Sequence, residues 1–386
     1  MIISQDVLYA GVNDNDISLF EGQFPVTEGM AYNSYVILDE KIAVVDSVDE
    51  SFGDLWIKKV EEILKGRIPE YLIVHHVEPD HSANIMKLAE KYPKAKIVAS
   101  AMAFMVLKNY FGTDFSDRRV VVKEGDTLSL GKHNLKFIAG TNIHWPEVLF
   151  SYDETDKILF SADAFGKFGA VNGKINFEDW IDEARRYYFG IVGKFGSFVQ
   201  TALNKISALD VKIICPLHGP VISERIADYV NLYDIWSKYG VESEGVLIPY
   251  TTVYGHTKRA VELFANKLNE AGCQNVEIID LTRDDVYKAI SAAFKYGKIV
   301  FATTTYCTEV FPAMREFIEA LKERNFANRK IAFIENGSWV PAAAKKMKEM
   351  FTGLENISFA ETTITVKGEM TEENKNQMDS LIKEIV

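Results

Sequence analysis

The chain has few cysteines, no excess of basic residues and no long uninterrupted apolar run. Its three cysteines, Cys215, Cys273 and Cys307, form no C-x-x-C pair, so a disulfide scaffold, a cysteine zinc site and a cysteine-ligated iron centre are unsupported. A reducing, cytoplasmic location is therefore expected. With a net charge of −12 the chain has no basic surplus to neutralise phosphates, so we expect neither a nucleic-acid nor a membrane partner. No segment approaches a membrane span in length, and Met1–Asp6 lacks the features of a signal peptide.

Length and composition are those of an ordinary soluble protein with more than one domain. The chain has 386 residues, of which 47% are hydrophobic and 25% charged. The pattern of strands and helices changes after Gly240–Glu244, which we interpret as a linker. We therefore predict a first domain over residues 1–243 and a second over residues 244–386.

The most informative stretch is H-H-V-E-P-D-H-S-A-N, from His75 to Asn84. It follows an apolar run that predicts a buried strand, Tyr71–Val74, and precedes a segment with helical spacing, Ile85–Tyr92. We expect the polar residues to lie on a loop that aims side chains at one point. The donors in this loop are His76, Glu78, Asp80 and His81. Such groups repel or desolvate one another unless a cation neutralises them, so a metal site is a better interpretation than a solvated loop.

Three more candidate ligands lie at the ends of predicted strands. His144 precedes a strand, Asp163 follows one in F-S-A-D-A-F-G, and His218 follows one in I-I-C-P-L-H-G-P. Alone, each would be a capped or surface residue. Imidazoles favour zinc, whereas added carboxylates favour harder ions such as iron or manganese. Two metal ions need about four to six donors each, shared through bridges.

The order of elements in the first domain predicts two layers of strands between helices. Helices are expected at Asp54–Leu64 and Ala101–Tyr110, and a hairpin within Ala31–Asp46. Further strands are predicted at Ala95–Ala99, Val120–Val122, Thr127–Leu130, Leu135–Ile138, Val148–Tyr152 and Ile158–Ser161. Strands with helices on both sides and no strict alternation fit an αββα sandwich.

The second domain alternates regularly between strands and helices. Strands are predicted at 245–250, 276–280, 298–302, 330–334 and near 364–366, each followed by a helix. Five such units predict a doubly wound parallel sheet. Ligands bind such sheets at the carboxyl ends of the strands.

The first strand-to-helix turn, Tyr250–Thr257, is neither a G-x-G-x-x-G nor a Walker loop. Its hydroxyls and backbone N–H groups at a helix start could form a phosphate cradle without a basic side chain, although mere helix capping is an alternative. The turn resembles the FMN-phosphate loop of flavodoxins. Two later strand ends resemble the other flavin loops. The predicted cofactor-binding residues are Thr252, Val253, Tyr254, Gly255, His256, Thr257, Thr303, Thr304, Thr305, Tyr306, Cys307, Asn336, Gly337, Ser338 and Trp339.

The motifs of both halves together resemble those of flavodiiron proteins. H-x-E-x-D-H is similar to the metallo-β-lactamase signature H-x-H-x-D-H, with Glu78 in place of the second histidine, as in the flavodiiron branch. The resemblance implies that His76, Glu78 and His144 hold one iron and that Asp80, His81 and His218 hold the other. It implies that Asp163 bridges both. It also implies an asparagine where His75 stands, so we interpret His75 as a residue that packs or hydrogen-bonds behind the ligands. His133 is interpreted as a surface residue.

The resemblance implies an FMN- and diiron-dependent reductase that converts dioxygen to water, nitric oxide to nitrous oxide, or both. It further implies a small electron donor such as rubredoxin, and a head-to-tail homodimer or a dimer of dimers. Two alternatives remain open: a zinc hydrolase of the metallo-β-lactamase superfamily with an appended flavodoxin-like domain, and an electron carrier whose first domain is a degenerate scaffold. The sequence does not rank oxygen against nitric oxide.

Overall fold

The computed structural model describes residues 1–173 and 175–386 and divides them into two compact units, Met1–Asp234 and Ile235–Val386. The domain boundary predicted at 243/244 stays a prediction. Among the described residues, no helix combines the length and apolar character needed to cross a bilayer.

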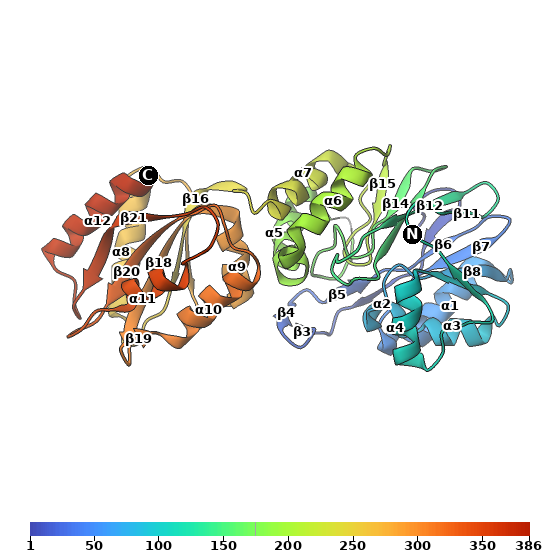
Figure 1. Ribbon diagram of the computed structural model, residues 1–386, viewed down its shortest axis with the longest axis horizontal. Coiled ribbons are helices and arrows are strands. Elements are labelled where there is room, and N and C mark those ends of the chain that lie inside the picture. Colours follow the sequence, from blue (N-terminus) through green and yellow to red (C-terminus); the bar gives the residue numbers. More distant parts are fainter. Residues whose placement is uncertain (174) are drawn as a thin grey trace. The chain divides into compact units, whose positions relative to one another are not determined.

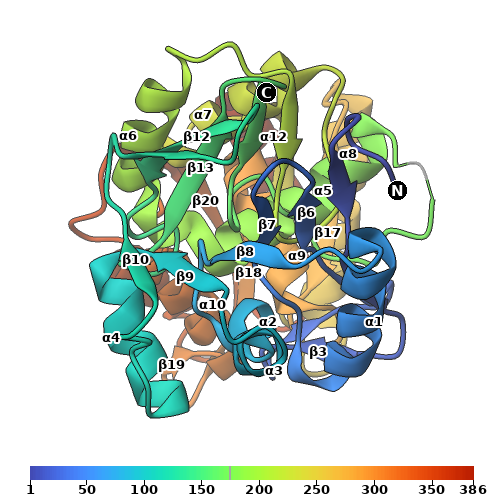
Figure 2. The same cartoon turned by 90° about the vertical axis from the view of Figure 1, so that its right-hand side faces the viewer.

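The first unit contains two facing sheets with helices outside them (Figures 1 and 2). One sheet has the order β1 (Val7–Tyr9), β6 (Tyr35–Ile37), β7 (Ile42–Val45), β8 (Pro69–Ile73), β9 (Lys96–Ala99) and β10 (Arg119–Val121). The other has the order β11 (Thr127–Ser129), β12 (Asn134–Ala139), β13 (Leu149–Asp153), β14 (Ile158–Phe160) and β15 (Ile213–Cys215). Two ribbons pair β2 (Val12–Asp14) with β5 (Met30–Tyr32) and β3 (Leu19–Phe20) with β4 (Phe24–Pro25).

Helices cover the outer side of each sheet, as Figure 2 shows. They are α1 (Gly53–Leu64), α2 (Pro79–Ser82), α3 (Ile85–Lys91), α4 (Ala101–Phe111), α5 (Phe177–Tyr187), α6 (Gly196–Ile206) and α7 (Ile226–Ser237). Capping explains the bounds of α4: the Ser100 side chain accepts a hydrogen bond from the Ala103 N–H, and Gly112 ends the helix with φ +70°. The predicted αββα sandwich is confirmed.

The apolar core of the first unit lies between the two sheets. Ile73 and Val98 come from one sheet, and Phe137 and Phe160 from the other; all are almost fully buried in a single cluster. Burying such side chains stabilises the sandwich by about 1.5–3 kcal/mol each. The polar loops at the strand ends are thereby held on a rigid base.

The second unit is a parallel sheet in the order β17 (Val276–Asp280), β16 (Ser243–Tyr250), β18 (Tyr296–Tyr306), β20 (Arg329–Asn336) and β21 (Ile357–Val366). A short strand, β19 (Glu309–Val310), pairs antiparallel with the end of β18. The helices are α8 (His256–Glu270), α9 (Val286–Lys295), α10 (Pro312–Glu323), α11 (Ala343–Met350) and α12 (Glu372–Ile385). This strand order is that of doubly wound flavodoxin-like sheets, as predicted.

Two details of these elements differ from the sequence-based expectation. The polar stretch after β8 is not all loop, because residues 79–82 form the short helix α2 with Pro79 in its first turn. Strand β18 continues to Tyr306 and turns back through Cys307 and Thr308, both with positive φ, into β19.

A buried arginine, Arg329, joins three chain segments near the start of the second unit. Arg329 is 2% exposed, and its guanidinium donates to carbonyl oxygens of three chain segments. The acceptors are the carbonyls of Tyr239, Gly240, Ala293, Phe294, Ala327 and Asn328. Burial lowers the pKa of Arg329 to about 10.

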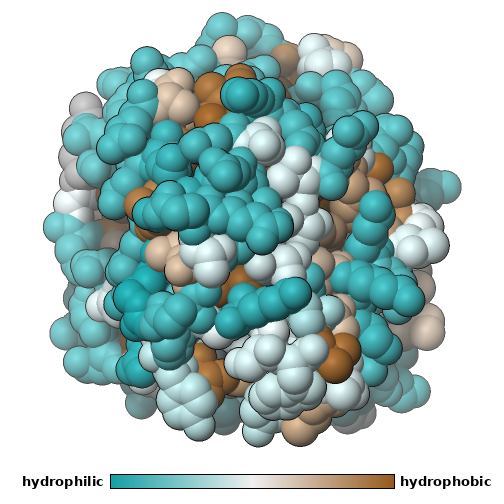
Figure 3. Space-filling model, turned by 90° about the vertical axis from the view of Figure 1, so that its left-hand side faces the viewer, coloured by the Kyte–Doolittle hydropathy of each residue, from teal (hydrophilic) through white to brown (hydrophobic). Residues whose placement is uncertain are grey.

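The face of the molecule in Figure 3 is mainly hydrophilic, with scattered apolar groups instead of one continuous patch.

Candidate functional site

The seven predicted metal ligands lie at strand ends of the first unit and form two groups of donors. His76 and Glu78 follow β8, Asp80 and His81 lie on α2, and the last three ligands follow β12, β14 and β15: His144, Asp163 and His218. Because strand ends of both sheets contribute donors, residues far apart in sequence come together here.

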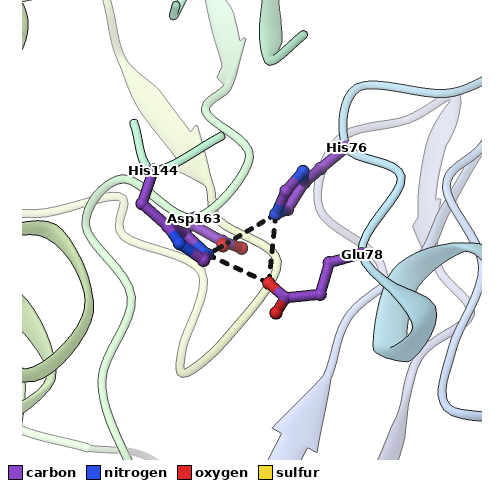
Figure 4. Close-up of side chains that lie close together, drawn as sticks. All are labelled: His76, Glu78, His144 and Asp163. Carbon is purple, nitrogen blue, oxygen red and sulfur yellow. Dashed lines mark hydrogen bonds and ion pairs between the residues drawn. The ribbon is translucent and has the colours of Figure 1, made fainter. Parts of the chain in front are cut away.

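The first group consists of His76, Glu78, His144 and Asp163 (Figure 4). Glu78 Oε2 lies 3.2 Å from His76 Nε2 and 2.9 Å from His144 Nε2. Asp163 Oδ2 lies 3.4 Å and 3.2 Å from the same two nitrogens. Ligands that each lie about 2.1 Å from one ion are roughly 3 Å from one another, so these spacings suit a metal ion.

The second group consists of Asp80, His81 and His218. The two Nε2 atoms are 3.0 Å apart, and each lies 3.3 Å from Asp80 Oδ2. Asp163 Oδ1 lies 3.2 Å from His81 Nε2. The two oxygens of Asp163 therefore face different groups, which is the geometry of a bridging carboxylate.

Unpaired buried oxygens test whether the donors fit metal ions. Among the described residues, both carboxylate oxygens of Asp80 and both of Asp163 are buried without a hydrogen-bond partner. Buried carboxylates are costly unless they are paired or coordinate a metal. Both carboxylates lie within 3.4 Å of imidazole nitrogens of the two groups, so this donor set fits a pair of cations.

Electrostatics at the site point the same way. Although burial alone would raise it, the positive charge of His76 and the nearby imidazoles of His144 and His81 hold the pKa of Asp163 well below its usual range. Burial would lower the pKa of His76, yet Asp163, Glu147 and Glu78 hold that pKa well above its usual range. The carboxylates thus require positive charge beside them, which protons on the imidazoles or metal ions can supply.

One side of the site is open and the other is sealed. The side chains of Glu78, Asp80 and His144 are 17%, 11% and 12% exposed, whereas those of His76 and His81 are inaccessible. On the sealed side, aromatic rings surround His218: those of Phe20, Tyr32 and Tyr187 have centroids 5.5–5.8 Å from it. A small molecule would therefore enter past Glu78, Asp80 and His144.

Sequence reasoning missed two carboxylates behind the ligands. Glu147 Oε1 lies 2.7 Å from His76 Nδ1 and also accepts a hydrogen bond from the Val77 N–H. Asp46 Oδ1 accepts hydrogen bonds from the backbone N–H groups of His75 and His76. The signal for Glu147 was a carboxylate three residues after His144, whereas nothing near Asp46 indicated its role.

The two remaining histidines of this unit lie outside the two groups of predicted ligands, although His133 belongs to a third group of candidate donors with Asp153 and Asp156. His75 is buried, with Nδ1 2.7 Å from Asp46 Oδ2 and Nε2 2.8 Å from Ser151 Oγ, so it packs and holds the loop as predicted. The prediction that His133 is a surface residue is wrong. Its side chain is inaccessible, and its Nδ1 lies 2.8 Å from Asp153 Oδ2.

In the second unit, a cavity of about 620 Å³ lies at the carboxyl ends of the parallel strands. Predicted cofactor-binding residues line most of it: Thr252, Val253, Tyr254, His256, Thr257, Thr304, Thr305, Tyr306, Cys307, Asn336, Gly337, Ser338 and Trp339. Sequence reasoning missed four further lining residues: Thr308, Val340, Gly368 and Glu369. This position and this lining suit a planar cofactor with a phosphate.

Two predicted residues lie behind the lining. Thr303 is fully buried, and its hydroxyl lies 2.6 Å from that of Thr251. Gly255 precedes α8 with φ +87°, and its N–H donates to the Thr252 hydroxyl, so it shapes the turn at the helix start.

Two basic side chains lie near this helix start, and both are paired with a carboxylate. The Arg259 guanidinium lies 2.7 Å, and His256 Nδ1 2.8 Å, from Glu369 Oε1. Because Glu369 lines the cavity and pairs with both basic groups, a phosphate cradle without a free basic side chain stays a prediction. Tyr254 and Trp339 are each 85% exposed beside the cavity.

Comparisons with known proteins match both units. Residues 30–219 match a family described as "ODP family beta lactamase", and residues 247–378 match a "Flavodoxin domain" family. The nitric oxide reductase of Moorella thermoacetica is 28% identical over 376 residues, which are 95% of this chain and 92% of that protein. The chain spans about half the length of the diflavin flavoproteins that it also matches, covering 49% of one from Synechocystis.

Solved structures agree with these matches. The flavodiiron protein of Giardia intestinalis aligns with a TM-score of 0.91 and 25% identity over 99% of this chain and 95% of that one. The rubredoxin oxygen:oxidoreductase of Desulfovibrio gigas aligns with a TM-score of 0.91 and 22% identity, over 100% of this chain and 97% of that one. The likeness to the Desulfovibrio gigas protein, at 22% identity, shows the fold alone.

Proposed function

Because the chain belongs to the flavodiiron family, whose members are FMN- and diiron-dependent oxidoreductases, we propose that it reduces dioxygen to water, nitric oxide to nitrous oxide, or both. Its cofactors are FMN and two non-haem irons. Full reduction of dioxygen consumes four electrons and four protons, whereas coupling two nitric oxide molecules consumes two of each.

The observation that carries this proposal is the division of seven donors into two groups that meet at Asp163. In this proposal His76, Glu78 and His144 hold one iron, Asp80, His81 and His218 hold the other, and Asp163 bridges both. When bound, two ferrous ions with open coordination positions would supply electrons to a diatomic substrate, and reduced FMN would replace those electrons.

The protein's own residues control access and water around this chemistry. The partly exposed edge at Glu78, Asp80 and His144 admits a small substrate. The aromatic rings around His218 exclude water from the opposite side. A dry, shaped wall behind the ligands lowers the local dielectric and strengthens the electrostatic interactions at the site.

The proposed electron source is a separate small redox protein such as rubredoxin. The chain contains no C-x-x-C pair that could hold a rubredoxin centre of its own. The similar protein from Desulfovibrio gigas is a rubredoxin oxygen:oxidoreductase, which supports this proposal. A cytoplasmic location would suit such a donor and the reduced cysteines.

We further propose a head-to-tail homodimer, or a dimer of such dimers, in which the FMN of one chain approaches the irons of its partner. Two large aromatic side chains, Tyr254 and Trp339, are 85% exposed beside the cofactor cavity. Exposed aromatic surface of this kind marks interaction sites. A closed two-fold pair would satisfy both contacts at once.

Kinetic measurements that start in oxygen-free buffer, to which either dioxygen or nitric oxide is then added, test the proposal. The protein, loaded with iron and FMN and supplied with reduced rubredoxin, should consume dioxygen or release nitrous oxide from nitric oxide. The alternatives predict otherwise: a zinc hydrolase would bind a stoichiometric zinc pair and hydrolyse esters or amides, and a plain electron carrier would oxidise rubredoxin without reducing either gas. Either result would overturn the proposal.

A further inference from the structure

Glu147 is the carboxylate closest behind the metal ligands. Its Oε1 lies 2.7 Å from His76 Nδ1, and neither side chain is accessible to solvent. The same oxygen accepts a hydrogen bond of 3.1 Å from the Val77 N–H. Among the described residues, Glu147 Oε2 is buried without a hydrogen-bond partner. Burying a carboxylate with one unpaired oxygen costs folding free energy, which indicates that the charge of Glu147 has a function.

The backbone around Glu147 fixes where this charge lies. The Glu147 carbonyl accepts a hydrogen bond of 3.0 Å from the Ser100 hydroxyl, at the start of α4. Two residues further on, the Leu149 N–H donates to the His75 carbonyl. The loop that carries Glu147 is thereby tied to the loop that carries His76, and the distance between the two side chains is held from both ends.

At His218 and His81, Nδ1 has a weaker hydrogen-bond partner than a carboxylate, or none. His218 Nδ1 donates to the neutral carbonyl of Ala31 at 2.8 Å. His81 Nδ1 is buried, and no described residue offers it a hydrogen-bond partner. Among the described residues, His76 thus has a carboxylate at Nδ1, whereas His81 and His218 do not.

A carboxylate behind an imidazole changes the imidazole as a ligand. With Nδ1–H donating to Glu147, the lone pair of His76 is on Nε2, which faces the first group of donors. The negative charge makes that nitrogen a stronger donor, and removing such support typically costs 10–100-fold in metal affinity. Extra negative charge also favours the more oxidised form of a metal ion.

We propose that Glu147 is a positioning residue that makes the two halves of the metal centre unequal. The ion held by His76, Glu78 and His144 is released last and oxidised first, and the ion held by Asp80, His81 and His218 is released first. This inference rests on the proposed function, because it requires two irons.

Chelation of the loaded protein tests the inequality. Wild-type protein exposed to a ferrous chelator without oxygen should release iron in a fast and a slow phase. In Glu147→Gln, which keeps the shape but removes the charge, the slow phase should accelerate about 10–100-fold while the fast phase stays within about twofold of wild type. In an EPR-monitored redox titration, the first oxidation should shift to a higher potential.

The chain offers a matched control. His133 and Asp153 form another His–carboxylate pair of 2.8 Å with inaccessible side chains, and neither belongs to the two groups of predicted ligands, although with Asp156 they form a third group of candidate donors. Asp153→Asn removes the same kind of charge from the same unit and should leave both phases and the potential unchanged. A Glu147→Asp variant, which restores the charge, should recover most of the slow phase.

Single-ligand variants assign the phases without depending on how Glu147→Gln folds. The slow phase should survive in His81→Ala and disappear in His144→Ala. The inference is overturned if the slow phase survives in His144→Ala, or if Glu147→Gln matches wild type or accelerates both phases equally. Wild-type protein that binds no iron pair would instead count against the proposed function.

Discussion

Asp163 approaches His81 through one carboxylate oxygen, Oδ1, at 3.2 Å and leaves its other oxygen to face a different set of donors. The carboxylate is 1% exposed, and neither oxygen has a hydrogen-bond partner among the described residues. A single side chain is therefore common to both donor groups.

Replacing Asp163 with alanine should remove both irons together. Loss of a shared ligand weakens both ions, so iron content and gas-reducing activity should each fall by at least about tenfold. The cofactor cavity is lined by residues of the second unit only, so FMN should stay bound. Elemental analysis measures the iron content, and flavin absorbance measures the bound FMN. Two irons and full turnover in this variant would show that Asp163 is not the bridge.

Metal identity is a second prediction. Three carboxylates among the seven donors favour iron over zinc, so protein produced with sufficient iron should contain two irons per chain. Chelation should abolish gas reduction, and ferrous iron should restore it while zinc should not. Recovery of activity with zinc alone would contradict the diiron assignment.

The electron source can be tested with the purified chain. No nicotinamide-type turn opens the second unit, and no C-x-x-C pair is present. We expect reduced rubredoxin to reduce the bound FMN rapidly, and NADH alone to reduce it at least about a hundredfold more slowly, because no site orients the nicotinamide. Stopped-flow absorbance follows the flavin. Comparable rates with NADH and rubredoxin would refute the prediction.

Electron transfer between chains can be tested by mixing two inactive variants. His81→Ala disables the metal site, and Gly255→Asp places a side chain and a negative charge at the proposed phosphate cradle, where φ is +87°. Reassembled heterodimers should regain part of the activity, because an intact FMN then faces intact irons. The control is each variant alone, treated identically. Confirmed heterodimers that keep their remaining cofactors but stay inactive would argue against cross-chain transfer.

His133 gives a prediction about pH. The hydrogen bond with Asp153 raises its pKa, against the effect of burial. Because the folded protein favours the protonated form, this contribution is fully present below pH ~6.5 and is lost as pH rises through the raised pKa. His133→Gln should therefore lower the melting temperature of the first unit more at pH 6 than at pH 9. Calorimetry at both values checks this, and an equal effect at both would disprove it.

The sequence was most informative where chemistry and local order coincide. H-x-E-x-D-H places four donors within six residues behind an apolar strand, and the five strands of the second unit alternate with helices of ordinary length. Both patterns are local, so they are readable without knowing the fold. The order His144, Asp163, His218 gained its meaning from the resemblance to a family.

What could not be predicted depends on contacts between distant segments. Asp46 and His75 are 29 residues apart, and Glu147 and His76 are 71 apart, and no spacing rule connects such pairs. His133 was predicted to be a surface residue, but its side chain is buried and its Nδ1 lies 2.8 Å from Asp153 at the end of β13. The extension of β18 to Tyr306 depends on pairing with β19, which two residues in the left-handed region permit.

The carbonyl oxygens around Arg329 determine how the second unit could be excised as a free-standing protein. Two of its acceptors, the carbonyls of Tyr239 and Gly240, precede the first strand of the sheet. A fragment cut at residue 244 would keep the whole cofactor cavity yet leave a buried guanidinium short of partners. A fragment that begins at Ile235 retains them all. The smallest autonomous flavin module is thus longer than its sheet. A gene fusion that begins at the first strand of the sheet would leave the buried Arg329 without two of its hydrogen-bond acceptors.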